Sequence, residues 1–145
     1  MSLEIKTADY QEQFELIKHI RTEVFQKEQK VPYELEFDGQ DNHATHFLAY
    51  LNKGAVGTLR IRNIDEKTVK IERLAVLSQF RNQGIGTKMM EKALEIIKIQ
   101  DYSTGIVHAQ EYIKDMYLKL GFIATGKIFE EAGIPHIKMI KNISK

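Results

Sequence analysis

The sequence predicts an α/β domain with a mixed, mostly antiparallel twisted sheet, one parallel pair of central strands and flanking helices. Apolar segments at 46–52, 55–63 and 68–77 follow one another with short turns, which predicts an antiparallel meander. An amphipathic helix pattern then separates 68–77 from an apolar strand at 104–109. A crossover of this kind makes the two strands it joins parallel.

Length and composition exclude several classes of function. The chain of 145 residues is expected to form a single domain, 1–145, and its 43% hydrophobic content is ordinary for a globular protein. Lys and Arg number 21 against 20 Asp and Glu, so the balance gives no general attraction to nucleic acid. No apolar run of about 20 residues and no signal peptide are seen, so we expect no membrane partner and a cytoplasmic location. The absence of cysteine excludes a cysteine acyl-enzyme, and the histidine spacing predicts no metal site.

The first part of the chain predicts a strand, a helix and a loop. Residues 2–6 read as a short strand, and a capping box at Asp9 begins a helix whose apolar stripe runs to about Gln29. Pro32 ends the helix, because proline disfavours helix in the residue before it. Residues 33–45 then form a long loop, and loops of this length are often functional.

The strand 68–77 carries an irregularity. Its alternation of apolar and polar residues shifts by one position at Glu72-Arg73. A β-bulge produces such a shift, and bulges often re-aim a side chain near a site. The alternative is a regular strand in which Arg73 extends its charged end to solvent.

The remaining pattern predicts alternating elements to the end of the chain. A helix runs from a glycine-rich loop to about Gln100, and Gly121 is placed to end a later helix. After the strand at 104–109, these elements are a helix over 111–120 and a pair of strands over 123–129 and 136–143.

The glycine-rich loop is the most informative motif. Arg81-Asn82-Gln83-Gly84-Ile85-Gly86 lies between a strand and a helix, where glycine lets backbone N–H groups approach an anion at the helix N-terminus. A dinucleotide fingerprint needs a third glycine where Met89 stands, and Gly86-Thr87-Lys88 is not the order of a P-loop. The motif therefore predicts a phosphate loop of another class, with a glycine-rich surface turn as the alternative.

Two motifs together resemble a known family. Arg-x-x-Gly-x-Gly after the strand 71–76 resembles the coenzyme A pyrophosphate loop of the GNAT superfamily of N-acetyltransferases. The segment 116–122, with Tyr117 and Gly121-Phe122, resembles the second signature of these enzymes, with a strand between the two motifs. Similarity at 25–32, 108–110 and 133–136 is closest to the ElaA-like branch.

The resemblance implies the GNAT fold over nearly the whole chain and an acetyl-CoA-dependent N-acetyltransferase. The acetyl group would pass directly from the thioester to a primary amine of a small molecule or peptide, and a homodimer stays open. A non-catalytic acyl-CoA-binding or sensing module is the alternative. Many relatives carry an asparagine near Gln110, so the side chain that orients the pantetheine is left open. The implied cofactor contacts are Leu74, Ala75, Val76, Arg81, Asn82, Gln83, Gly84, Ile85, Gly86 and Thr87.

The same resemblance implies the catalytic candidates. Tyr117 matches the general acid, and a phenol is a suitable proton donor to a leaving thiolate. Glu72 matches the position of a carboxylate base, with an ion pair to Arg73 or a lysine as the alternative. His108 and His136 are further candidates for the base, because histidine changes its charge near neutral pH. The alternative for His108 is a hydrogen-bonded core residue.

The acceptor side carries many carboxylates. They predict either an acidic rim that favours a cationic amine or a solvated acidic loop. The residues are Glu28, Glu34, Glu36, Asp38 and Asp41.

Overall fold

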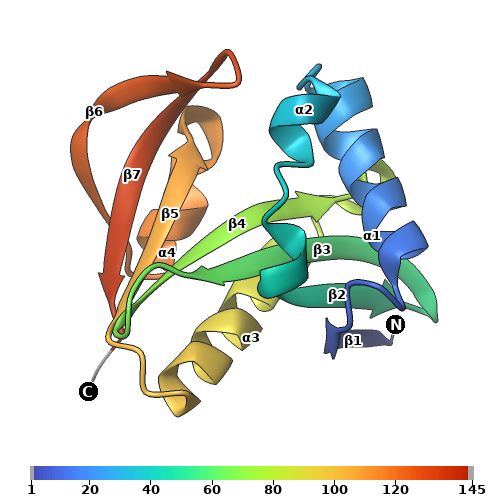
Figure 1. Ribbon diagram of the computed structural model, residues 1–145, viewed down its shortest axis with the longest axis horizontal. Coiled ribbons are helices and arrows are strands. Elements are labelled where there is room, and N and C mark those ends of the chain that lie inside the picture. Colours follow the sequence, from blue (N-terminus) through green and yellow to red (C-terminus); the bar gives the residue numbers. More distant parts are fainter. Residues whose placement is uncertain (1, 144–145) are drawn as a thin grey trace.

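The computed structural model describes residues 2–143 and is built on a seven-stranded sheet in the order β1-β2-β3-β4-β5-β7-β6 (Figure 1). The strands are β1 (Leu3–Ala8), β2 (Thr45–Leu51), β3 (Gly54–Asn63), β4 (Thr68–Val76), β5 (Thr104–Gln110), β6 (Ile123–Glu131) and β7 (Ile134–Asn142). The α-helices are α1 (Phe14–Arg21), α2 (Tyr33–Glu36), α3 (Ile85–Ile99) and α4 (Lys114–Lys119). Short 3-10 helices lie at Asp41–His43, Ser78–Phe80 and Glu111–Ile113.

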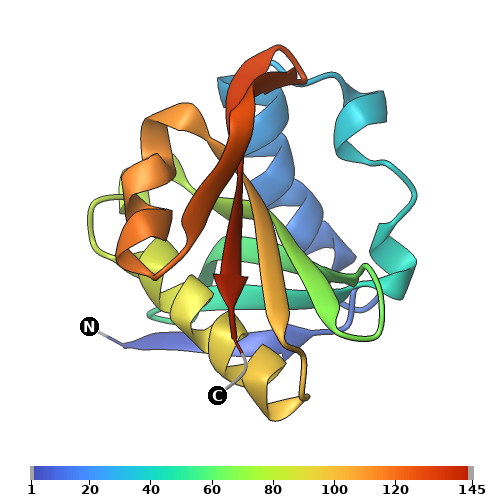
Figure 2. The same ribbon diagram turned by 90° about the vertical axis from the view of Figure 1, so that its left-hand side faces the viewer.

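Helices cover both faces of the sheet. Figure 2 shows α1 and α2 on one side of the strands and α3 and α4 on the other. Ile17 and Ile20 of α1 pack against one apolar cluster, whereas Met89 and Ile97 of α3 belong to a second cluster on the opposite face. The four side chains are fully buried, so apolar burial holds both helices to the sheet. No helix within residues 2–143 has the length and apolar character of a membrane span.

The first helical segment ends close to the predicted residue, but its second half is not an α-helix. After α1 the chain continues as a π-helix, Thr22–Glu28, in which Gln29 N–H donates to Val24 O at 3.1 Å. A π-helix is wider than an α-helix and is frequent at functional sites. The apolar periodicity located the segment but not this widening, because both helix types keep one apolar face.

The predicted capping box forms in part. Asp9 Oδ1 accepts hydrogen bonds from the N–H groups of Gln11 and Glu12, both at 3.0 Å. Regular helix begins only at Phe14, after a turn. Asp9 therefore caps the turn that leads into α1 rather than α1 itself.

The predicted parallel pair is present and brief. Thr68–Lys70 of β4 pairs with Thr104–Ile106 of β5, and beyond this point the two strands diverge (Figure 1). β4 continues beside β3, whereas β5 continues beside β7. The later part of β4 consequently has a backbone edge that β5 leaves open.

The predicted β-bulge in β4 is confirmed. Arg60 pairs with Glu72 and Thr58 pairs with Ala75, so β4 has one more residue than β3 in this interval. Arg73 has φ of 58°, in the left-handed region that non-glycine residues rarely adopt. The bulge lies where β4 borders the space left by β5, and it re-aims the side chains that follow.

The last two strands are longer than predicted. A tight turn at Ala132-Gly133, with φ of 53° and 75°, joins β6 to β7, so β6 ends at Glu131 and β7 begins at Ile134. Alanine is a poor signal for a turn that needs positive φ. The sequence placed the turn around Gly133-Ile134-Pro135, which locates it, but the predicted strands ended two residues short on each side.

Candidate active site

A cleft of about 770 Å³ opens where β4 and β5 separate. Its walls come from β4, the glycine-rich loop, the start of α3, α4, β5 and the turn between β6 and β7. The four catalytic candidates, Tyr117, Glu72, His108 and His136, all line it. So do the predicted cofactor contacts except Gln83, which is exposed and is not part of the wall.

The glycine-rich loop forms the N-terminus of α3. Gly84 is the N-cap with φ of 77°, and Asn82 has φ of 64°. No side chain caps this helix within the described residues. The first N–H groups of a helix have no partner within it, so this end can accept an anion.

Gly86 has a different role from Gly84. A Cβ on Gly86 would lie 3.8 Å from Met116 Sδ and 3.9 Å from Leu74 Cδ2, which is ordinary contact. A Cβ on Gly84 would meet nothing within 4 Å, but its positive φ disfavours other residues. The first glycine of the motif is thus needed for the turn, and the second lies against the cleft wall.

Arg81 is held by two partners. Its Nε donates to Val76 O at 2.9 Å, and its Nη2 donates to Glu28 Oε1 at 2.6 Å. A second bond from Nη1 makes the contact with Glu28 bidentate, and the hydrogen bond from Arg81 lowers the pKa of that carboxyl. An anion bound at the loop would compete with Glu28 for this guanidinium.

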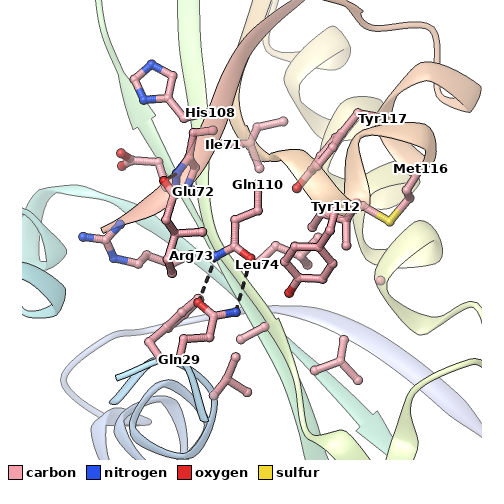
Figure 3. A pocket seen from close by; sticks show the side chains of 18 of the residues that line it. Gln29, Ile71, Glu72, Arg73, Leu74, His108, Gln110, Tyr112, Met116 and Tyr117 are labelled. Carbon is pink, nitrogen blue, oxygen red and sulfur yellow. Dashed lines mark hydrogen bonds between the residues drawn. The ribbon is translucent and has the colours of Figure 1, made fainter. Parts of the chain in front are cut away.

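Tyr117 is buried in the wall beside α3. Its ring packs edge-on against Phe122 at 5.8 Å between centroids, and Figure 3 shows its hydroxyl end directed into the cleft. Gly121, with φ of 96°, ends α4, and Phe122 N–H donates to Tyr117 O at 3.0 Å. This turn explains the Tyr-x-x-x-Gly-Phe spacing. Burial raises the pKa of Tyr117 well above its usual value, so the hydroxyl is protonated at neutral pH.

Glu72 lies at the centre of a group of cations. Its carboxylate accepts hydrogen bonds from Arg60 at 2.8 Å and Arg62 at 2.6 Å, and Lys70 Nζ lies 3.2 Å away. Burial alone would raise its pKa, but the hydrogen bond from Arg62 and the charge of Arg60 lower the pKa of Glu72 to about 2. A carboxylate of this kind is a weak proton acceptor.

His108 has a carboxylate partner that the sequence did not reveal. Its Nδ1 lies 3.0 Å from Glu131 Oε1, and the hydrogen bond from His108 lowers the pKa of Glu131. Because an ionised carboxylate only accepts, Nδ1 carries a proton, which in the neutral ring places the lone pair on Nε2. Glu131 lies beyond Phe129, where the predicted strand ended, so it was not expected to be a strand residue next to His108.

His136 is more enclosed than His108. Its Nδ1 lies 2.7 Å from Ile134 O, to which it donates, and its ring stacks on Phe129. Its Nε2 lies 4.0 Å from Glu131 Oε2, on the other side of that carboxylate from His108. The side chain is almost completely buried, which limits its access to a substrate.

A pair of glutamines bridges the cleft. Gln110 Nε2 donates to Gln29 Oε1 at 2.9 Å, and Gln29 Nε2 donates back at 3.3 Å (Figure 3). The pair joins the end of the first helix to the end of β5. Gln110, which stands near the position where many relatives carry an asparagine, is thus hydrogen-bonded to Gln29 across the cleft.

Three of the five carboxylates, Glu36, Asp38 and Asp41, form neither the predicted acidic rim nor a solvated acidic loop, because arginines pair with them. Glu34 is exposed, and Glu28 is paired with Arg81. Arg21 binds Glu36 and Asp41, whereas Asp38 accepts hydrogen bonds from Arg60. Burial alone would raise the pKa of Asp38, but the hydrogen bond from Arg60 lowers it far below its usual value. These carboxylates are neutralised by buried arginines, because the loop folds onto β3 and β4, which carry the cations.

Comparison with known proteins adds independent information. A family model described as Acetyltransferase (GNAT) domain matches residues 6–143. The chain is 38% identical over 137 residues to the uncharacterized N-acetyltransferase YjcF of Bacillus subtilis, with 93% of this chain and 96% of YjcF covered. It is 32% identical over 129 residues to protein ElaA of Escherichia coli, with 86% of this chain and 84% of ElaA covered.

Solved structures agree with the sequence matches. An acyl-CoA N-acyltransferase from Pseudomonas aeruginosa has a TM-score of 0.86 at 30% identity, over 97% of this chain and 99% of that one. The crystal structure of Escherichia coli ElaA has a TM-score of 0.86 at 28% identity, over 97% and 100%. A GNAT acetyltransferase from Elizabethkingia anophelis, solved with acetyl-CoA bound, shares the fold with a TM-score of 0.73 at 19% identity, over 97% of each chain. The predicted fold is confirmed.

Proposed function

The chain belongs to the GNAT family of acetyltransferases and has ElaA among its relatives, and on this basis we propose that it is an acetyl-CoA-dependent N-acetyltransferase. It transfers the acetyl group directly from the thioester to a primary amine of a small molecule or peptide. One observation carries the proposal most strongly. The cleft between β4 and β5 has the N-terminus of α3, without a side-chain cap, along one wall and a buried, protonated tyrosine in another.

The donor half of the cleft suits coenzyme A. The N-terminus of α3 and the loop at Asn82 and Gly84 bind the pyrophosphate through backbone N–H groups. The open edge of β4 at Leu74, Ala75 and Val76 pairs with the pantetheine, as an added strand would. An N–H group near the bulge then polarises the thioester carbonyl.

The chemistry requires two proton transfers. The amine nitrogen bonds to the acetyl carbon and gives a proton to His108 Nε2, while the C–S bond breaks and Tyr117 gives its proton to the leaving sulfur. Glu131 holds the His108 ring in the tautomer that can accept the proton. Glu72 is the weaker alternative, because its ion pairs lower its basicity. No cluster of three or more metal-binding side chains occurs within residues 2–143, and the scheme uses no metal.

The test follows thiol release from acetyl-CoA with a panel of amines. Tyr117→Phe is expected to lower kcat by about 100-fold, within the range for a general acid, while the Kd for coenzyme A stays unchanged. His108→Gln is expected to lower kcat at neutral pH, whereas Glu131→Gln reduces it less because the imidazole itself remains. Unchanged kcat in Tyr117→Phe would remove Tyr117 from the mechanism.

The alternative is a module that binds or senses acyl-CoA without chemistry. It requires coenzyme A binding by calorimetry together with no thiol release from any amine in the panel. Tyr117 with its hydroxyl directed into the cleft favours the enzyme, since a binding module has no need of a proton donor there. The cytoplasmic location and the homodimer stay predictions.

A further inference from the structure

A network of ion pairs lies along and behind the acceptor half of the cleft. Among the described residues, five cations share four carboxylates there. The cations are Arg21, Arg60, Arg62, Lys70 and Arg73, and the carboxylates are Glu36, Asp38, Asp41 and Glu72. Glu131, which also lines the cleft, adds a fifth carboxylate, and its charge acts on Lys70 from a greater distance.

Lys70 and Arg62 are the cations of this network with the fewest ion-pair partners. Arg21, Arg60 and Arg73 each contact at least two carboxylates. In contrast, Lys70 and Arg62 both rely on Glu72, which Arg60 also uses. Both side chains line the cleft, with 17% and 26% of their surface exposed. A ligand can therefore reach them without breaking the buried network.

The two cations lie close to the proposed base. Lys70 pairs with Ile106 across the parallel ladder, and His108 lies two residues beyond Ile106, a rise of about 7 Å along β5. Glu131, which is partly exposed, follows beside His108. Along this wall a positive region at Lys70 and Arg62 is thus followed by the His108–Glu131 pair, within the length of one small molecule.

We propose that the acceptor is a small amine that carries a carboxylate, as an amino acid does. Its carboxylate binds Lys70 and Arg62, and its amine lies at His108, where Glu131 attracts the ammonium form. The ammonium gives one proton to solvent water, and the neutral amine gives a second proton to His108 when it attacks. A polyamine would instead place a second positive charge against Lys70 and Arg62, which is unfavourable. This inference rests on the proposed function, because it names the acceptor of that reaction.

Matched acceptors test the inference with the wild-type protein. Thiol release is measured for a panel of amino acids, for their amides and methyl esters, and for the corresponding amines without the carboxyl group. The carboxylates are expected to have kcat/KM at least about tenfold higher than their neutral partners, the size of one charge-assisted contact. Equal or better rates for the neutral or polycationic amines would overturn the inference while leaving the acetyltransferase proposal intact. No release from any amine would refute the proposed function, and the inference with it.

Variants locate the effect. Lys70→Gln and Arg62→Gln are expected to raise KM for the preferred carboxylate roughly tenfold or more, with little change for its amide and none in coenzyme A affinity. Lys70→Arg should restore most of the loss. Lys67→Gln is the matched control, since Lys67 lies on the turn before β4 with 63% of its side chain exposed. Thermal unfolding checks that each variant is folded, and an unchanged KM in both folded glutamine variants would overturn the inference.

Discussion

The two halves of the cleft are built from different parts of the chain. The donor half is mainly backbone, with the edge of β4, the turn at Gly84 and the N-terminus of α3. The acceptor half is mainly charged side chains from α1, α2, β3 and β4, and Arg21 and Arg60 are almost fully buried. Backbone contacts do not depend on side-chain identity, so they suit a cofactor that a whole family shares. Side chains can differ between relatives with the same fold, so they suit an acceptor that differs from one relative to the next.

The largest expected effect is a loss of stability when a buried ion pair of the acceptor half is removed. Arg21→Met leaves Glu36 and Asp41 buried with fewer positive partners, which should lower the free energy of unfolding by about 3–5 kcal/mol. Urea unfolding measures this difference. Lys27→Met is the control, since its pair with Glu23 is exposed and should contribute under about 0.5 kcal/mol. Equal losses in the two variants would contradict a structural role for the buried pairs.

The next effect is the contribution of Glu72 to stability, which depends on pH. The folded pKa of Glu72, about 2, lies below the reference value of 4.5, so its ion pairs contribute stability that is complete above about pH 4.5. This contribution is lost as pH falls toward 2, and amounts to roughly 2–3 kcal/mol. Glu72→Gln should therefore destabilise the protein at pH 6 and lose less than the wild type on acidification. Urea unfolding at pH 6 and pH 3 measures both, and parallel pH profiles would exclude this role.

A smaller effect separates the two glycines of the donor half. Gly84→Ala places a side chain at φ of 77° and should cost about 1–2 kcal/mol. Gly86→Ala meets only ordinary contacts and should change stability by less than about 0.5 kcal/mol. Thermal unfolding and calorimetry with coenzyme A compare the two. A larger loss of stability in Gly86→Ala would contradict the roles assigned to the two positions.

The donor half was the more predictable one, for a physical reason. The turn at Asn82 and Gly84 and the start of α3 are matters of local backbone geometry, which the order of glycines and neighbouring elements indicates directly. The shift of apolar phase at Glu72-Arg73 likewise indicated the bulge, because alternation of side chains is a local property. The fold class followed from the same periodicities.

The acceptor half depends on contacts between residues far apart in sequence. Arg21 meets Asp41, and His108 meets Glu131, only after the loop and the last strands have folded. Charge spacing along the chain does not reveal such partners, so the carboxylates of the loop looked like an acidic rim. The sequence predicted the turn around Gly133-Ile134-Pro135 but ended the strand before it at Phe129, because alanine at 132 rarely marks a turn with positive φ, so Glu131 was not expected beside His108.

The smallest expected effect is on coenzyme A affinity, at an ion pair that connects the two halves of the cleft. Glu28, at the end of the π-helix, binds the Arg81 guanidinium that lies beside the proposed pyrophosphate site. If the anion uses this guanidinium, Glu28→Gln removes a competitor and should tighten coenzyme A binding by up to about fivefold, the worth of a partly exposed ion pair. The gain should shrink as salt screens the competing charge. Glu23→Gln, on the same helix and paired with Lys27, is the control. Weaker coenzyme A binding in Glu28→Gln would mean instead that Glu28 holds Arg81 in the orientation that the cofactor needs, so the two halves would cooperate rather than compete.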